Sequence, residues 1–175
     1  MIKDTPEQHF FKYAWPCTEI ILTDKRIPQQ RFDDLKYAIE NNITPSREIL
    51  EDTYKVAFAN LKELAERLSK EQNKEINYWD MEVIQRYFTE AEHNMFIESE
   101  KAFFCKFPPA VKDLCKIHTA VIDKIEVISD RIILFVKYKD DKGEEKERRC
   151  LNIYNLEIKP QDKVIIHYGY IIEKA

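Results

Sequence analysis

The spacing of apolar residues changes about two thirds of the way along this chain, and that change limits the folds open to it. From about residue 31 to residue 103, apolar side chains recur every three or four residues, the period of an amphipathic α-helix. From residue 117 to residue 173, short runs of β-branched and apolar residues predict strands instead. Pro108-Pro109 lies near the change, and consecutive prolines end a helix. We therefore expect an α+β chain.

The N-terminal part, residues 1–110, is expected to form a helical domain built as an antiparallel helix hairpin or bundle. A first helix is predicted over residues 31–41. A second is predicted from an N-cap at Thr44 to about residue 70. A third begins near Asn77 and continues past Met95 along the same apolar seam.

Residues 111–175 are expected to form a small OB-like antiparallel β-barrel. The predicted strands cover residues 120–125, 131–138, 144–153, 164–167 and 170–173. Asp140–Gly143 is predicted to be a turn with a positive φ at its glycine. The charged run from Lys137 to Arg149 is expected to be a solvated hairpin.

Composition excludes several classes of protein. Hydrophobic residues make up 44% of the 175 residues, enough for a packed core. The net charge of −4 argues against nucleic acid as the main partner, because phosphate binding needs a basic surface. No apolar run is long enough to span a membrane, and the N-terminus lacks the apolar stretch of a signal peptide. A cytoplasmic location is expected, with four cysteines present as thiols.

The end of the chain carries the most specific motif. Asp162 is followed by an apolar strand that ends at His167, and Gly169-Tyr170 then opens a second short strand. The chain has only two glycines, so we expect Gly169 to provide a positive φ or a close backbone approach that orients the imidazole. This block resembles the closing signature of the HypC/HupF hydrogenase-maturation chaperones.

Two further segments extend the resemblance to about residues 113–175. Leu114-Cys115 stands where the family has its Met-Cys-Leu start, and Arg148–Ile153 resembles the family's R-R-x-V-S/N-L strand. Some positions depart from the family pattern: Cys115 is internal, and Gln161 replaces the usual glycine before the aspartate.

The resemblance implies a non-catalytic chaperone or adaptor in metallocentre assembly, such as that of nickel–iron hydrogenase. It implies that the Cys115 thiolate binds iron transiently as cargo and that His167 lies near it, as a second ligand or a hydrogen-bond partner. The partner would be a maturation scaffold or a hydrogenase-like client protein. We further expect Cys115 to be the functional thiol, with a pKa lowered by His167, and Cys17, Cys105 and Cys150 to have no such role.

Other interpretations remain open at this point. The β-domain could be a protein-interaction adaptor with no metal role. The helical domain could instead be a metal-dependent enzyme, since Glu90 and His93 form the E-x-x-H spacing of di-iron bundles. Cys115 and His118 form a C-x-x-H pair, but a structural zinc site needs a second pair, which the sequence lacks. No phosphate loop, serine elbow or pair of catalytic carboxylates appears in the sequence.

Apolar stretches outside these elements are expected to pack within the protein. Phe103, Phe104 and Phe107 are expected to be buried between the helical domain and the β-domain. The residues around Phe10 and Trp15 are expected to pack as an arm on the bundle.

Overall fold

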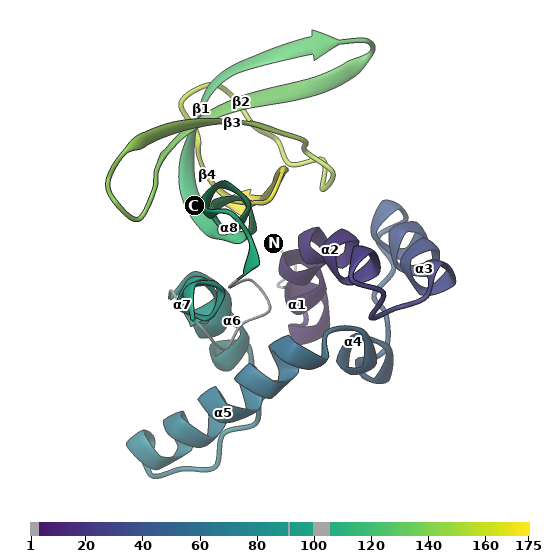
Figure 1. Ribbon diagram of the computed structural model, residues 1–175, viewed down its shortest axis with the longest axis vertical. Coiled ribbons are helices and arrows are strands. Elements are labelled where there is room, and N and C mark those ends of the chain that lie inside the picture. Colours follow the sequence, from purple (N-terminus) through teal and green to yellow (C-terminus); the bar gives the residue numbers. More distant parts are fainter. Residues whose placement is uncertain (1–3, 91, 100–105) are drawn as a thin grey trace. The chain divides into compact units, whose positions relative to one another are not determined.

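A computed structural model describes residues 4–90, 92–99 and 106–175 (Figure 1). The chain divides into two compact units, residues 1–93 and 94–175. Helices precede strands along the chain, so the predicted α+β class and its order are confirmed. The expected domain boundary near residue 110 stays a prediction.

The first unit is helical throughout its described part. Its elements are α1 (Pro6–Ala14), the 3-10 helix η1 (Trp15–Cys17), α2 (Thr18–Thr23), α3 (Gln29–Glu40), α4 (Arg47–Thr53), α5 (Lys55–Gln72) and α6 (Met81–Thr89). Aromatic rings fill its core: the ring of Phe10 on α1 lies 4.5 Å from that of Phe58 on α5 and 5.7 Å from that of Phe88 on α6. The expected N-terminal arm is thus a set of helices, and its rings hold the other helices together.

Several helices begin or end at other residues than the sequence predicts. The expected helix over residues 44–70 is two helices, because the backbone turns at Tyr54, whose φ of −105° and ψ of 42° leave the helical region. The N-cap is Ser46, whose hydroxyl accepts a hydrogen bond from the Ile49 amide, and not Thr44. The third helix starts after Asp80 and not near Asn77. Its seam does not include Met95, which is 65% exposed.

The second unit contains a five-stranded sheet. Its strands are β1 (Ile117–Ile128), β2 (Arg131–Lys139), β3 (Glu145–Cys150), β4 (Lys163–His167) and β5 (Tyr170–Lys174), in the order β3-β2-β1-β4-β5. Neighbouring strands are antiparallel. All five strands fall where sequence periodicity predicts them, and the turn before β3 has Gly143 at a φ of +77°, as expected.

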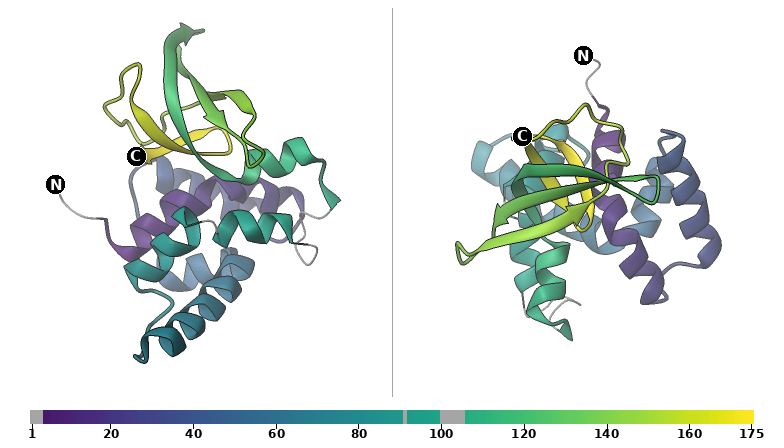
Figure 2. Two further views of the ribbon diagram at one scale, coloured as in Figure 1. Left: turned by 90° about the vertical axis from the view of Figure 1, so that its left-hand side faces the viewer. Right: turned by 90° about the horizontal axis from the view of Figure 1, so that it is seen from above.

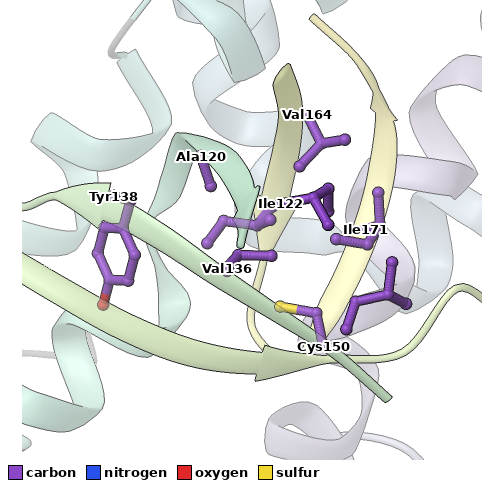
Figure 3. Close-up of a cluster of buried hydrophobic side chains, with 9 residues drawn as sticks. Ala120, Ile122, Val136, Tyr138, Cys150, Val164 and Ile171 are labelled. Carbon is purple, nitrogen blue, oxygen red and sulfur yellow. The ribbon is translucent and has the colours of Figure 1, made fainter. Parts of the chain in front are cut away.

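Each strand contributes side chains to one apolar interior (Figure 3). Ile122, Val136, Cys150, Val164 and Ile171 come from β1 to β5 in turn, and each is at most 1% exposed. The alternation of buried and exposed residues along the strands therefore places one face of the curved sheet on this core.

The sheet is not closed into a barrel, contrary to expectation. Its edge strands approach at an isolated parallel bridge between Leu151 and Tyr170, where the Leu151 amide donates to the Gly169 carbonyl at 2.8 Å. Leu156 and Ile158, in the segment between β3 and β4, pack against the core.

Two helices precede the sheet. α7 (Glu92–Glu98) leads into the second unit, and α8 (Pro109–Cys115) immediately precedes β1. The Asn94 side chain links α7 to the first residue of β1: its Oδ1 accepts from the Ile117 amide at 2.9 Å, and its Nδ2 donates to the Ile117 carbonyl at 2.8 Å. Asn94 thus bonds the backbone of β1 as a neighbouring strand would.

Candidate functional site at the end of helix α8

The structure brings together the two residues that the resemblance assigns to iron. Strands β1 and β4 pair so that Ile117 lies opposite His167, and this places the imidazole beside the end of α8. His167 is fully buried, and its Nε2 lies 3.0 Å from the main-chain oxygen of Cys115. A carbonyl oxygen can only accept, so Nε2 carries a proton and donates it. The imidazole therefore donates to the backbone of Cys115.

The thiol of Cys115 is not activated. The side chain is fully buried, and burial raises its pKa to about 12, although the charge of Arg148 acts in the opposite direction. The expectation of a lowered pKa is therefore wrong for this arrangement. Near neutral pH the group is a protonated thiol, whereas metal binding and nucleophilic attack need the thiolate.

The last turn of α8 is held by donors from the sheet. The carbonyl oxygens that end a helix have no partner within it. Here the Asp113 carbonyl accepts from Nη2 of Arg148 at 3.1 Å, and the Leu114 carbonyl accepts from the Tyr168 amide at 2.9 Å. His167 serves the Cys115 carbonyl in the same way. Three consecutive carbonyls are thus bonded to β3 and to the end of β4.

The Asp113 carboxylate is the centre of a polar cluster beneath this turn. It accepts from Nη2 of Arg148 at 3.0 Å, from the Tyr138 hydroxyl at 2.5 Å and from Nε2 of His118, which lies 3.1 Å from Oδ1. Arg148 also donates to the Tyr138 hydroxyl at 2.8 Å and to the Tyr168 carbonyl at 3.1 Å. We call Asp113, His118, Tyr138 and Arg148 the α8 clamp.

The surroundings shift the acid–base properties of the clamp. Burial, followed by the hydrogen bond to Asp113, raises the pKa of Tyr138 to about 12. Burial lowers the pKa of His118, and the nearby Asp113 carboxylate only partly offsets this effect. Near neutral pH the clamp therefore holds a neutral phenol and a guanidinium paired with a carboxylate.

Sequence reasoning missed this clamp. The charged run that contains Arg148 was expected to be solvated, but Arg148 is only 8% exposed. Strand alternation could have revealed it, because Arg148 shares a face with the buried Cys150. An arginine at an inward position needs a paired acceptor, since buried charges are seldom left alone.

Gly169, the glycine of the motif, does not have the role that the sequence predicts. Gly169 is not among the residues with positive φ, whereas Tyr168 has a φ of 56°. A Cβ added at Gly169 would come no nearer than 4.0 Å to the Arg149 carbonyl oxygen, so no close backbone approach requires glycine. The imidazole is oriented by strand pairing and by the hydrogen bond to α8.

The other candidate residues do not form the sites considered above. Glu90 lies beyond the end of α6, forms an exposed ion pair with Arg86, and precedes the separate helix that holds His93, so the E-x-x-H is not on one continuous helix. In the C-x-x-H pair, Nε2 of His118 lies 3.1 Å from Oδ1 of Asp113, so this ring nitrogen is engaged by the carboxylate. Cys150 is buried in the sheet core, and burial raises its pKa to about 12.

Some expectations fall on residues outside the described ranges. Phe103, Phe104 and Cys105 lie there, and Phe107 is half-buried.

Comparison of the chain with models of known protein families, with curated proteins and with solved structures finds no match. Among the described residues, no helix combines the length and the apolar character needed to cross a bilayer.

Proposed function

We propose that the protein is a non-catalytic accessory protein of metallocentre assembly that acts by binding a maturation scaffold or a hydrogenase-like client. One observation carries this proposal: Cys115 and His167, on which the resemblance depends, lie together at one end of the sheet although they are 52 residues apart in sequence. A chance similarity of short motifs would give no reason for these two residues to meet.

The strand order supports the OB-like part of the proposal. A five-stranded, partly open sheet with β1 at its centre and edge strands that approach in parallel is the arrangement of an OB-like fold. Such small sheets commonly act as binding modules, whose specificity lies in their loops and hairpins.

Exposed apolar side chains on the β1–β2 hairpin support the proposal of a protein partner. Figure 2 shows this hairpin extending beyond the rest of the sheet. Val127 and Ile132 are cross-strand partners near its tip, 72% and 59% exposed. They lie on the same face as the pair Ile125 and Leu134, which packs into the core, so the apolar row continues from the core into solvent. An exposed apolar patch of this kind is typical of a protein-binding site.

Iron as cargo is the second component of the proposal. A thiolate is a suitable ligand for low-spin iron that carries strong-field ligands. The buried, protonated Cys115 cannot provide a thiolate while the α8 clamp is closed. This burial favours the alternative of an adaptor with no metal role, which would keep the partner and lose the cargo.

The test is a reconstitution under anaerobic conditions. The full chain is mixed with a purified maturation scaffold or hydrogenase client, the complex is isolated by gel filtration, and its iron is quantified. We expect a complex that a Val127→Ser/Ile132→Ser variant weakens at least tenfold. Iron in the complex should be lost in Cys115→Ser and retained in Cys150→Ala, a matched control.

The outcomes separate the candidate functions. A complex without iron would support the adaptor. Iron or manganese that is bound without a partner and is unaffected by Cys115→Ser would point to the metal-enzyme alternative. No complex with either protein would overturn the proposal.

A further inference from the structure

Helix α8 is held in the second unit mainly by polar contacts, whereas the strands are held by their ladder hydrogen bonds and the apolar core. Pro109 and Ala110 at its start are exposed, and Val111 and Leu114 are only half-buried. None of its residues other than Cys115 is fully buried. The helix therefore has little apolar packing of its own, and polar contacts at its last turn do most of the holding.

Those contacts all lie within a few residues of Cys115. The Asp113 carboxylate is bonded to side chains of β1, β2 and β3, and the carbonyls of Asp113, Leu114 and Cys115 are bonded to Arg148, Tyr168 and His167. Loss of the Asp113 carboxylate would leave Arg148 buried without its charge partner. Such a polar cluster fails as a unit, because removal of one member leaves the others unsatisfied.

Cys150 provides the contrast within the same unit. It is the last residue of β3, lies opposite Leu134 on β2 and belongs to the apolar core together with Ile122 and Ile171 (Figure 3). Its exposure requires β3 to separate from the sheet. Local openings with few apolar contacts occur at a lower free energy than global unfolding.

We infer that the last turn of α8 is a latch that opens locally, with the sheet intact, and that this opening exposes the Cys115 thiol. The inference rests on the proposed function in one respect: the exposed thiol would be the group that receives or passes on the iron cargo. In the closed state the thiol is fully buried. Opening exposes it to water, where a thiol reagent can reach it.

Thiol labelling of the full chain tests the latch. N-ethylmaleimide is added in excess at pH 8 without denaturant, and peptide mass spectrometry follows each of the four cysteines separately. We expect Cys115 to label at least tenfold faster than Cys150 in the wild-type protein. Asp113→Asn should raise the Cys115 rate at least a further tenfold, and Cys150, which becomes exposed only when the sheet is disrupted, should still label at least tenfold more slowly than Cys115. Glu147→Gln is the matched control, since its carboxylate is 76% exposed on β3, and it should change neither rate.

Hydrogen exchange provides a second measurement that needs no variant. The Tyr168 amide, which donates to the Leu114 carbonyl on α8, should exchange faster than the Ile122 amide of β1, which donates to the Asp162 carbonyl just before β4. Equal labelling rates for Cys115 and Cys150, in the wild-type protein or in Asp113→Asn, would show that only global unfolding exposes Cys115 and would overturn the latch. Labelling requires neither metal nor partner, so this result is independent of the reconstitution.

Discussion

The imidazole of His167 donates a hydrogen bond to the main-chain oxygen of Cys115 across 3.0 Å. The bond joins the end of β4 to the end of α8, and both partners are fully buried. A histidine near a cysteine is usually considered as a base or a metal ligand. In this arrangement the ring nitrogen is engaged by the backbone, and the thiol beside it is protonated. The closed state is therefore a resting state with respect to thiol chemistry.

The two glycines should differ in their tolerance of alanine. Gly143 has a φ of +77°, where a side chain is strained even though open space surrounds it, and Gly143→Ala should lower the free energy of unfolding by about 1–2 kcal/mol. Gly169 has neither a positive φ nor a crowded Cβ position, so Gly169→Ala should change it by less than about 1 kcal/mol. Urea denaturation of both variants measures the difference. A larger loss for Gly169→Ala would restore the role that the motif first suggested for this glycine.

Stability should fall at alkaline pH, in part through Cys150. An unfolded cysteine has a pKa of about 8.5, and burial raises the pKa of Cys150 to about 12 in the folded chain. Between these values the unfolded chain has released the proton and the folded chain has kept it. The contribution of Cys150 to the free energy of unfolding is therefore fully present below about pH 8.5 and is lost as the pH rises toward the folded pKa of about 12.

Replacing the thiol isolates its share of this loss. Cys150→Val fills a similar volume without a titrating group, so it should remove up to about 1.4 kcal/mol per pH unit from the alkaline slope. Urea denaturation at intervals from pH 8 to 11 measures this slope. Cys115 and Tyr138, whose pKa values are also raised to about 12, should keep a residual slope in the variant. Identical slopes in the two proteins would contradict the buried, protonated state of Cys150.

Asp113 and Arg148 should be strongly coupled. Asp113→Asn leaves the guanidinium without its charge partner in a site where the Arg148 side chain is 6% exposed, and it should lower the free energy of unfolding by about 2–3 kcal/mol. The double variant Asp113→Asn/Arg148→Met should be more stable than Asp113→Asn alone, because it removes the unpaired charge as well. A double-mutant cycle measures the coupling. Additive losses would show that the two residues act independently.

Sequence patterns predicted the fold better than the site. Periodicity located every strand, because alternation in a half-buried sheet is a local property of the chain. The same periodicity predicted α4 and α5 as one helix, because no proline or glycine marks the point near Tyr54 where the chain changes direction. It also predicted a closed barrel, which the structure does not show, because pairing between the edge strands is a long-range property that a local pattern does not encode.

The resemblance drew attention to Cys115 and His167, and Nε2 of His167 lies 3.0 Å from the main-chain oxygen of Cys115. Their role as metal ligands stays a prediction. Which atom of Cys115 the imidazole meets depends on strand register and on the path of α8, and a motif encodes neither. The run of charged residues predicts a solvated Arg148, but this side chain points inward and is buried. From that position it holds the end of α8.

The tautomer of His167 tests the central structural claim most directly. Long-range ¹⁵N–¹H correlation spectra of the full chain near neutral pH report which ring nitrogen carries the proton. We predict that Nε2 carries a proton, which exchanges slowly with water because it is bonded to the buried Cys115 carbonyl. His167→Gln, which places an amide donor near the same position, should preserve stability better than His167→Ala. A ring protonated only at Nδ1, or an Nε2 proton that exchanges as fast as that of an exposed histidine, would contradict the account.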